Sequence, residues 1–175
     1  MRIIAGEFRS RRIETPEGTA TRPTPDRLRE SMFSILRPHM TGETVFADLY
    51  AGCGAVGMEA LSRGAARALF LEKDPGCVRL IRSNLAALGL ESRARVIQGA
   101  VARHVEGLEA DIYFLDPPYA LEREYDLVLP RLEGLVIAQH DRRKLLLEQY
   151  GELRRFREVR QGDNCLSFYR SDPPR

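Results

Sequence analysis

The 175-residue sequence contains no tryptophan, only three cysteines and only two lysines. Cys53, Cys77 and Cys165 are far apart and odd in number, so they form neither a disulfide framework nor a zinc-binding spacing. The three histidines are scattered and include no HExxH-like pair, so we expect no metal. No apolar run approaches the roughly 18 residues of a membrane span, and the first residues lack a signal peptide's apolar core. We therefore expect a cytoplasmic protein without membrane contact.

Arginine supplies nearly all of the positive charge, and its distribution is uneven. The chain has 27 basic and 25 acidic side chains, a net charge of +2. Residues 1–40 hold eight arginines and five acids, a balance of +3, so residues 41–175 sum to −1. A basic segment of this kind can bind nucleic-acid phosphates, although charge alone equally allows a solvated surface. The arginine bias fits a GC-rich genome or a thermophile.

Residue patterns predict an N-terminal arm over residues 1–24 and one globular unit over residues 25–175. Residues 3–14 predict two short strands around a turn, and Thr24 predicts the N-cap of an amphipathic helix over residues 25–37. Beyond residue 44, strands alternate with helices, which predicts a mainly parallel sheet with helices on both faces. We expect strands over 45–49, 68–71, 94–98, 112–115 and 135–139, helices over 56–63 and 75–88, and an antiparallel pair over 154–160 and 165–170.

A glycine-rich loop follows the first strand of the alternating region. It reads Asp48-Leu49-Tyr50-Ala51-Gly52-Cys53-Gly54 and continues to Gly57, which gives the spacing Gly-x-Gly-x-x-Gly. Glycines let a ligand approach the backbone, and the next helix offers free N–H groups, so the spacing also fits a dinucleotide site. The Asp48 carboxylate would repel a pyrophosphate but attract the ammonium of a methionine moiety. The loop therefore favours a methionine-containing cofactor.

Acidic residues also follow the second strand. Glu72 comes directly after the apolar run that ends at Leu71, and Lys73 and Asp74 follow it. A carboxylate at this strand end can accept hydrogen bonds from both ribose hydroxyls of an adenosine. In the alternative interpretation Glu72 is solvated and Asp74 only caps its helix. The position of Glu72 at the end of a buried strand favours the ribose contact.

The most informative motif is Asp116-Pro117-Pro118-Tyr119, which follows the apolar run Ile112–Leu115. An exocyclic purine amine is a poor nucleophile because its lone pair is delocalised into the ring. Hydrogen bonds to the Asp116 carboxylate and the Pro117 carbonyl would hold that nitrogen in position for in-line attack on a sulfonium methyl group. The prolines stiffen the loop, and Tyr119 can stack on an extruded base. A merely rigid turn is the structural alternative.

Taken together, these segments resemble the RsmD family of 16S ribosomal RNA (guanine-N2)-methyltransferases, which are class I S-adenosylmethionine-dependent enzymes. The resemblance is carried by Arg2-Ile3-Ile4-Ala5-Gly6, by Arg22-Pro23-Thr24-x-Asp26-Arg27-x-Arg29-Glu30, by the segment from Asp48 to Ala65, by the motif at Asp116 and by Gly162-x-x-x-Leu166-Ser167-x-Tyr169. It implies a Rossmann-like fold with a mainly parallel seven-stranded sheet, helices on both faces and an antiparallel C-terminal strand. A basic N-terminal β-hairpin and a helix precede that sheet.

The resemblance also implies a role for particular residues. Asp48, Gly52 and Gly54 would hold the methionine end of S-adenosylmethionine, Glu72 its ribose, and backbone groups at Gly99 and Ala100, where many relatives carry an acid or amide, its adenine. The wider cofactor-binding set adds Tyr50, Ala51, Cys53 and Lys73, and the catalytic set is Asp116, Pro117, Pro118 and Tyr119. The rRNA-binding set is Arg2, Arg9, Arg11, Arg12, Arg22, Thr24, Arg27 and Arg29, of which Arg22 and Thr24 could instead cover the cofactor.

The resemblance implies methyl transfer to N2 of guanine 966 in 16S rRNA, presented in the small ribosomal subunit or an assembly intermediate. The motif at Asp116 alone leaves other planar nitrogens open, namely adenine N6 in a nucleic acid and a protein glutamine amide. A catalytically silent RNA-binding protein with the same fold is the non-enzyme alternative. The basic arm favours a nucleic acid over a protein substrate. We expect a monomer.

Overall fold

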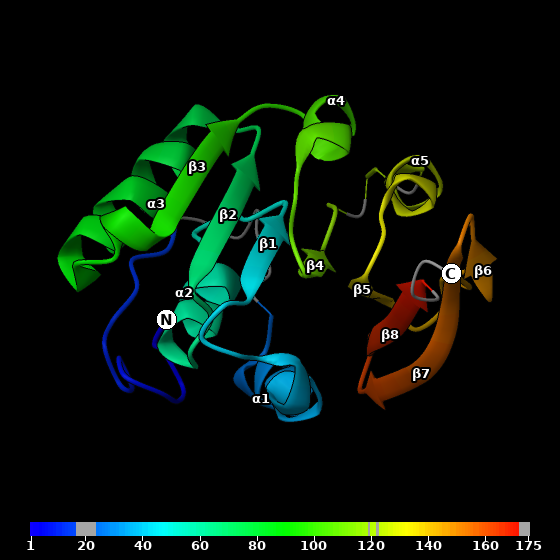
Figure 1. The fold of residues 1–175 in the computed structure, drawn as a ribbon, viewed down its shortest axis with the longest axis horizontal. Helices are drawn as coiled ribbons and strands as arrows, with labels where there is room; N and C mark the ends of the chain where they lie inside the picture. Colours follow the sequence, from blue (N-terminus) through cyan, green and yellow to red (C-terminus); the bar gives the residue numbers. More distant parts are fainter. Residues whose placement is uncertain (17–23, 119, 122, 172–175) are drawn as a thin grey trace.

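The computed structural model describes residues 1–16, 24–118, 120, 121 and 123–171. Its centre is an eight-stranded sheet with the order β3-β2-β1-β4-β5-β8-β7-β6 (Figure 1). The first five strands in this order are parallel, and β8, β7 and β6 each pair antiparallel with the preceding strand. The strands are β1 (Val45–Leu49), β2 (Arg67–Glu72), β3 (Ala94–Gln98), β4 (Ile112–Leu115), β5 (Leu135–Asp141), β6 (Gln149–Tyr150), β7 (Leu153–Gln161) and β8 (Asn164–Ser171).

The expected α/β architecture is confirmed, with one more strand than the seven predicted. The addition is β6, whose two residues pair with the start of β7. Two residues are too short to produce the alternating pattern by which a strand is recognised in a sequence. The pair β7–β8 lies where it was predicted, and residues Gly162 and Asp163 form the turn between its strands.

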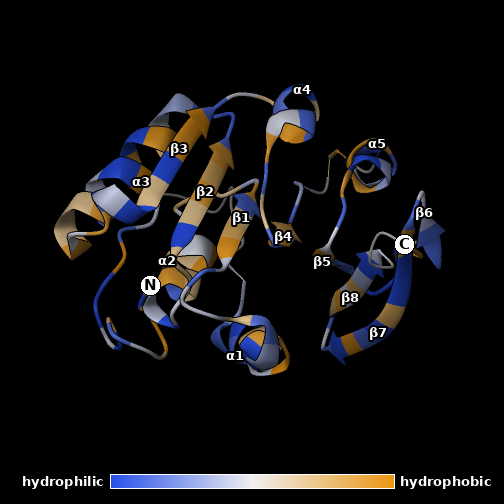
Figure 2. Ribbon diagram, viewed as in Figure 1, coloured by the Kyte–Doolittle hydropathy of each residue, from blue (hydrophilic) through white to orange (hydrophobic). Residues whose placement is uncertain are grey.

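Helices cover both faces of the sheet. One face carries α1 (Asp26–Leu36), α2 (Ala55–Ser62) and α3 (Pro75–Leu88), and the other carries α4 (Val101–His104) and α5 (Glu124–Val128). Apolar residues are concentrated in the central strands and in the helix faces that pack on them (Figure 2). Short 3-10 turns lie at Arg37–His39, Glu91–Arg93, Val105–Gly107 and Leu129–Arg131. Among the described residues, no helix combines the length and hydropathy of a membrane-crossing segment.

Local sequence explains why α3 begins and ends where predicted. The Asp74 carboxylate accepts a hydrogen bond from the backbone N–H of Cys77 at 2.8 Å, and Pro75 occupies the first helical position. Gly89 ends the helix in the left-handed conformation, with φ of 69°. These caps fix the direction of α3 relative to β2 and β3, and so its N-terminus lies at the carboxyl edge of the sheet.

The predicted N-terminal β-hairpin is wrong, because residues 3–14 form no strands. A single antiparallel bridge joins Arg2 and Arg12, and beside it the N–H groups of Ile3 and Ile13 donate to the carbonyls of Arg11 and Met1 at 3.0 and 2.9 Å, but neither side extends into a strand. The backbone N–H groups of Ile4 and Ala5, which a strand would use for pairing, donate instead to the Glu59 carboxylate of α2 at 2.8 and 3.1 Å. Backbone pairing is therefore limited to residues 1–3 and 10–13, and contacts with α2 take its place beyond Ile3.

The predicted N-cap of α1 is also wrong. Pro25 precedes the first helical residue, Asp26, and no side chain caps the helix. The Thr24 hydroxyl donates instead to Oε1 of Gln139, at the carboxyl end of β5, at 3.0 Å. This bond ties the start of α1 to the same sheet edge as the N-terminus of α3.

Candidate active site

The carboxyl ends of β1, β2 and β4 meet at the edge where ligands bind in open α/β sheets. The strand order reverses between β1 and β4, and the carboxyl ends of strands at such a switch point are where ligands bind in sheets of this kind. The glycine loop follows β1, Glu72 ends β2 and Asp116 follows β4. The structure therefore brings together the three motifs that the sequence places at separate strand ends.

The glycine loop follows β1 through a series of left-handed backbone conformations. Gly52 and Gly54 have φ values of 58° and 82°, and Tyr50 adopts φ of 64°, which is unusual for a residue with a side chain. A Cβ at Gly54 would lie 2.9 Å from Cε of Met58, whereas a Cβ at Gly52 would meet nothing within 4 Å. Gly54 is thus packed against the core, and Gly52 presents open backbone at the edge of the sheet.

Tyr50 connects the glycine loop to α5. Its hydroxyl donates to Oε2 of Glu124 at 2.5 Å. Burial, followed by the bond to Glu124, raises the pKa of Tyr50, so the hydroxyl stays protonated as a donor. Backbone strain of this kind clusters at functional sites. Sequence reasoning missed Glu124, because nothing in its local sequence indicates a partner 74 residues away.

The carboxylates of Asp48 and Glu72 accept hydrogen bonds from backbone N–H groups of the glycine loop. Oδ2 of Asp48, a buried side chain, accepts a hydrogen bond from the Gly57 N–H at 2.8 Å. The half-buried Glu72 carboxylate accepts from the N–H groups of Gly52 and Asp74, each at 2.8 Å. The acidic residues predicted to bind the cofactor therefore also organise the loop. Asn84 adds a further support that the sequence did not indicate, donating from Nδ2 to the Cys53 carbonyl at 3.1 Å.

Three carboxyl groups share this site, and the pKa values of two of them, Asp48 and Asp116, are raised. Burial raises the pKa of Asp48 well above its ordinary range, the Gly57 hydrogen bond opposes that rise, and the charges of Asp116 and Glu72 add to it. Burial also raises the pKa of Asp116 to about 7. Clustered carboxyl groups with raised pKa values favour a positively charged ligand over an anionic one.

The loop after β4 begins inside the protein and then turns outward. Pro117 is buried, Pro118 is exposed, and the Pro118 carbonyl accepts a hydrogen bond from the N–H of Leu121 at 2.8 Å. The Asp116 side chain makes no hydrogen bond to another described residue. Its acceptor oxygens thus remain available to a substrate. Tyr119, the predicted stacking residue, lies outside the described residues.

The other predicted cofactor residues lie along the same edge. Ala51 is buried, and its N–H donates to the Leu71 carbonyl of β2 at 2.8 Å. The Gly99 N–H donates to the Glu72 carbonyl at 2.9 Å, which places Gly99 and the following Ala100 beside the end of β2. Lys73 is exposed, and Cys53 is half-buried within the glycine loop. Their contacts with a cofactor stay a prediction.

Two residues of the predicted RNA-binding set are corrected by their burial. The Arg29 side chain is fully buried. It donates to the Arg2 carbonyl at 2.7 Å and lies 3.9 Å from the Glu59 carboxylate. Thr24 is buried against Gln139. Neither side chain can reach a phosphate, because each is enclosed by the protein and used in internal contacts.

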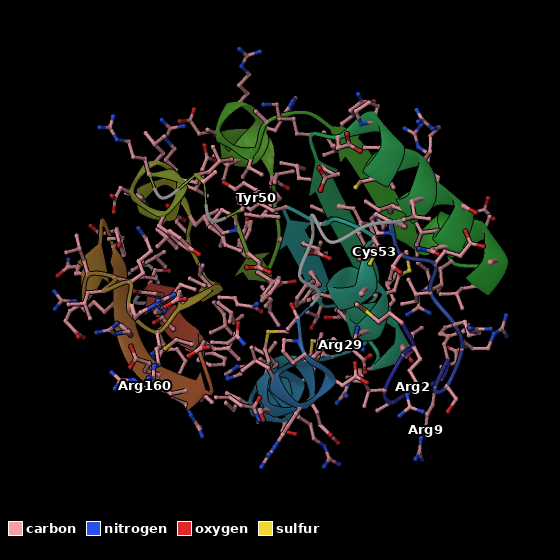
Figure 3. The ribbon with its side chains drawn as sticks, turned by 180° about the vertical axis from the view of Figure 1, so that it is seen from behind. Arg2, Arg9, Arg29, Tyr50, Cys53 and Arg160 are labelled. Carbon is pink, nitrogen blue, oxygen red and sulfur yellow. The ribbon has the colours of Figure 1, made fainter. Side chains whose placement is uncertain are left out.

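The exposed arginines of the N-terminal segment lie far from the glycine loop. The backbone N–H groups of Glu7 and Phe8 donate to Ser62 at the end of α2, and Nη2 of Arg11 donates to the carbonyl of Ala87 near the end of α3. Both helix ends lie at the amino edge of the sheet, opposite the candidate site. Figure 3 shows Arg2 and Arg9 beyond α2, well separated from Tyr50. Arg12 and Arg27 are also exposed, and Arg22 lies outside the described residues.

One group of potential metal ligands occurs among the described residues. His140, Glu158 and Cys165 have ligand atoms within 4.8 Å of one another. Both His140 ring nitrogens already have oxygen partners at 2.9 Å, and Glu158 pairs with Arg155 and Arg160. The geometry is therefore that of a hydrogen-bonded cluster.

Comparisons with known proteins agree with this geometry. The sequence model of the family described as "Conserved hypothetical protein 95" matches residues 1–170. The protein named "Putative rRNA methyltransferase YlbH" from Bacillus subtilis is 33% identical over 97% of this chain and 98% of its own length. "Ribosomal RNA small subunit methyltransferase D" from Escherichia coli K12 is 38% identical over 68% of this chain, a match that spans 60% of that protein.

A solved structure extends the similarity to the whole fold. The structure titled "Putative methyltransferase yhhF from Escherichia coli" superposes with a TM-score of 0.86 at 30% identity, covering 98% of both chains. The match therefore includes the N-terminal segment and the C-terminal strands as well as the parallel sheet. Together with the matched motifs, these similarities show that the chain belongs to the RsmD family of class I S-adenosylmethionine-dependent methyltransferases.

Proposed function

We propose that this protein transfers the methyl group of S-adenosylmethionine to the exocyclic N2 of a guanine in 16S rRNA, at position 966. The observation that carries the proposal is the open, acidic strand end at Asp116 beside the glycine loop. Relatives named as rRNA and small-subunit rRNA methyltransferases support an rRNA substrate. The guanine and its position rest on the resemblance to the RsmD family.

The residues present fit S-adenosylmethionine better than a dinucleotide. Asp48, Glu72 and Asp116 are three acidic groups that a pyrophosphate would disfavour, whereas a bound sulfonium and ammonium would favour their ionised forms. Gly52 leaves open space at the backbone. In this proposal Gly52 and Gly54 contact the methionine moiety, Glu72 accepts the ribose hydroxyls, and the bound cofactor supplies an electrophilic methyl group.

Asp116 and Pro117 position the amine in this proposal. The ionised carboxylate accepts one N–H of the guanine N2 group, and the Pro117 carbonyl accepts the other. Two acceptors held by a stiff loop orient the nitrogen lone pair toward the methyl group, and orientation supplies a large part of the acceleration. The proton that the nitrogen loses on methylation can pass to Asp116, whose raised pKa makes it a suitable acceptor near neutral pH.

The test is transfer of a labelled methyl group to small ribosomal subunits, and separately to naked 16S rRNA, from cells that lack this modification. We expect a single labelled guanine, identified by mapping the modified base. Label on adenine, or on a ribosomal protein, would refute the guanine proposal and favour the other planar nitrogens. Asp116→Ala should abolish transfer while cofactor binding stays nearly unchanged, so near-normal turnover would refute the role of Asp116.

A further inference from the structure

A second arginine-rich surface lies on the C-terminal strands. Residues 141–171 hold eight basic and five acidic side chains, a balance of +3 that equals the balance of residues 1–40. Figure 2 shows β7 as largely hydrophilic, and Figure 3 shows Arg160 on the opposite side of the molecule from Arg2 and Arg9. We define the C-terminal basic surface as Arg142, Lys144, Arg154, Arg157, Arg160 and Arg170.

Four residues of this surface, Arg142, Lys144, Arg157 and Arg160, line a pocket of about 340 Å³ between the loop over residues 142–148 and β7. The strand β6 pairs with β7 at Leu153 and Arg154, so the second half of β7 has a free edge. The loop folds beside that edge, where the Arg155 N–H donates to the Glu148 carbonyl at 2.8 Å. The pocket is therefore shaped by backbone as well as by long side chains.

The acids that line the pocket are already paired. Glu158 lies 3.1 Å from Nη1 of Arg155 and 2.7 Å from Nη2 of Arg160, and Arg155 also contacts Glu148. Arg157 lies on the same strand and has no acidic partner among the described residues. The pocket thus retains positive charge that the protein does not neutralise.

A like-charge pair outside the pocket adds to the positive charge of the surface. Arg154 of β7 lies directly opposite Arg170 of β8. Like charges in direct opposition destabilise a strand pair, and a bound anion removes that cost. Neither arginine has an acidic partner among the residues that the structure describes. A polyanion is the ligand that such a row of charges fits best.

Exposed apolar side chains accompany the charges. Leu145 is 88% exposed, Leu147 60% and Phe156 43%, which are three of the five most exposed large apolar side chains that are described. The guanidinium of Arg170 lies 5.2 Å from the centre of the Phe156 ring. Aromatic rings and arginine planes together are typical of surfaces that stack on unpaired bases.

Strand register places the carboxyl half of β7 close to the candidate site, whereas Arg154 and Arg170 lie level with Leu135 at the start of β5. Leu115, just before Asp116, pairs with Ala138, which pairs with Ser167, which in turn pairs with Glu158. Three strand spacings of about 4.8 Å separate β4 from β7 by about 14 Å. Both β5 and β7 are antiparallel to β8, so their carboxyl ends lie at the same edge. An RNA whose base reaches Asp116 can therefore continue across β7.

We propose that the C-terminal basic surface binds the RNA that flanks the methylated nucleotide. Its exposed arginines contact phosphates, and Phe156 stacks on an unpaired base. The proposal rests on the proposed function for its substrate, but it assigns the RNA contacts near the site to β7, β8 and the loop after β5. Arg2, Arg9 and Arg11, which lie beyond α2 and α3 (Figure 3), would contact a different part of the RNA.

The test compares two triple variants that lose the same charge. In one, Arg142, Arg154 and Arg157 are replaced by Ala; in the control, Arg67, Arg82 and Arg95 are replaced, which are exposed at the other end of the sheet. Binding of a labelled single-stranded fragment of 16S rRNA containing the proposed guanine is measured over a range of salt concentrations. Each lost phosphate contact should lower the salt slope by about 0.7, so the first variant should lose about 2 units and bind about 100-fold more weakly near 0.1 M salt.

The control variant should keep the wild-type slope, and both variants should bind S-adenosylhomocysteine normally. Phe156→Ala should weaken binding about 5- to 150-fold with an unchanged slope. Equal losses in the two triple variants, or an unchanged slope in the first, would overturn the inference. A wild-type dimer that becomes monomeric in the first variant would assign the surface to a protein contact instead and also overturn it. If wild type methylates no RNA but the slopes differ as expected, the proposed function fails and the RNA surface stands.

Discussion

The ionised Asp116 carboxylate lowers the stability of the folded protein because it is buried, whereas the proposed chemistry needs it. The variant Asp116→Asn separates these two effects. The buried carboxyl has a pKa of about 7 against an ordinary 3.8, so the folded protein holds a proton that the unfolded chain has already released. Because the folded state binds the proton more tightly between these values, the free energy of unfolding falls as pH rises from about 3.8 to about 7 and stays low above it. A shift of about 3 units corresponds to about 4 kcal/mol in total.

Asn has a similar shape and no charge, so Asp116→Asn should stabilise the protein more at high pH than at low pH. The gain should be about 1.6 kcal/mol near pH 5 and approach about 4 kcal/mol above pH 7.5, a difference of about 2–3 kcal/mol. In a domain of this size that difference corresponds to about 4–12 °C in Tm, with the lower end favoured because Asp116 is partly exposed.

The assay is thermal unfolding of wild type, Asp116→Asn and the exposed control Asp163→Asn at the two pH values, without cofactor. A gain for Asp116→Asn that does not grow with pH would refute the burial penalty. The same ionisation governs the proposed chemistry, since only the carboxylate form accepts both the amine hydrogen bond and the departing proton. The methyl-transfer rate of wild type should therefore rise with pH through about 7, and Asp116→Asn should be inactive although more stable, a trade-off common at functional sites.

Three further predictions concern Glu72, the buried Arg29 and the glycine loop. Glu72→Gln should weaken S-adenosylmethionine binding by about 1.5–3 kcal/mol, measured by calorimetry, because charge-assisted bonds are lost; unchanged affinity would exclude a ribose contact. Arg29→Met should reduce the free energy of unfolding by about 1.5–3 kcal/mol in urea titrations, since the Arg2 carbonyl loses its charged donor while Arg63 still pairs with Glu59, and a cost below about 0.5 kcal/mol would contradict that contact. Gly57→Ala should disrupt the loop, because its Cβ would lie 2.3 Å from the Phe70 ring. Gly52→Ala should cost only about 1 kcal/mol of backbone strain, because its Cβ would meet nothing within 4 Å. Similar Tm values for the two variants would contradict this difference in packing.

The parallel core could be predicted from sequence because its signals are local. The strands at 45–49, 94–98 and 112–115 and the helix at 75–88 have the predicted bounds, each marked by an apolar run or by a cap within a few residues. The three strand ends converge as a parallel sheet requires. Their geometry could be anticipated, while the roles of Asp48, Glu72 and Asp116 toward a ligand stay predictions.

The structure of the N-terminal segment could not be predicted from the sequence, because its hydrogen-bond partners are distant in the chain. Ile4 and Ala5 bond to Glu59, more than 50 residues away, and the same carboxylate draws Arg29 into the interior. An arginine beside other arginines indicates a surface only when no buried acid faces it. Burial of Arg29 therefore depends on the packing of α1 against α2, which no local pattern reports.

The C-terminal basic surface could not be recognised from the sequence for a different reason, which lies in how charge is distributed along the chain. Residues 41–140 hold ten basic and fourteen acidic side chains, a balance of −4, and this deficit conceals the +3 of residues 141–171 when both are summed. The acidic segment includes Asp48, Glu72 and Asp116, which meet at the candidate site. An acidic centre between two basic segments would bind two kinds of ligand in different places, according to their charge. In the proposed function the acidic centre would favour a cationic methyl donor over the RNA backbone, and the basic flanks would hold the backbone while a neutral base enters.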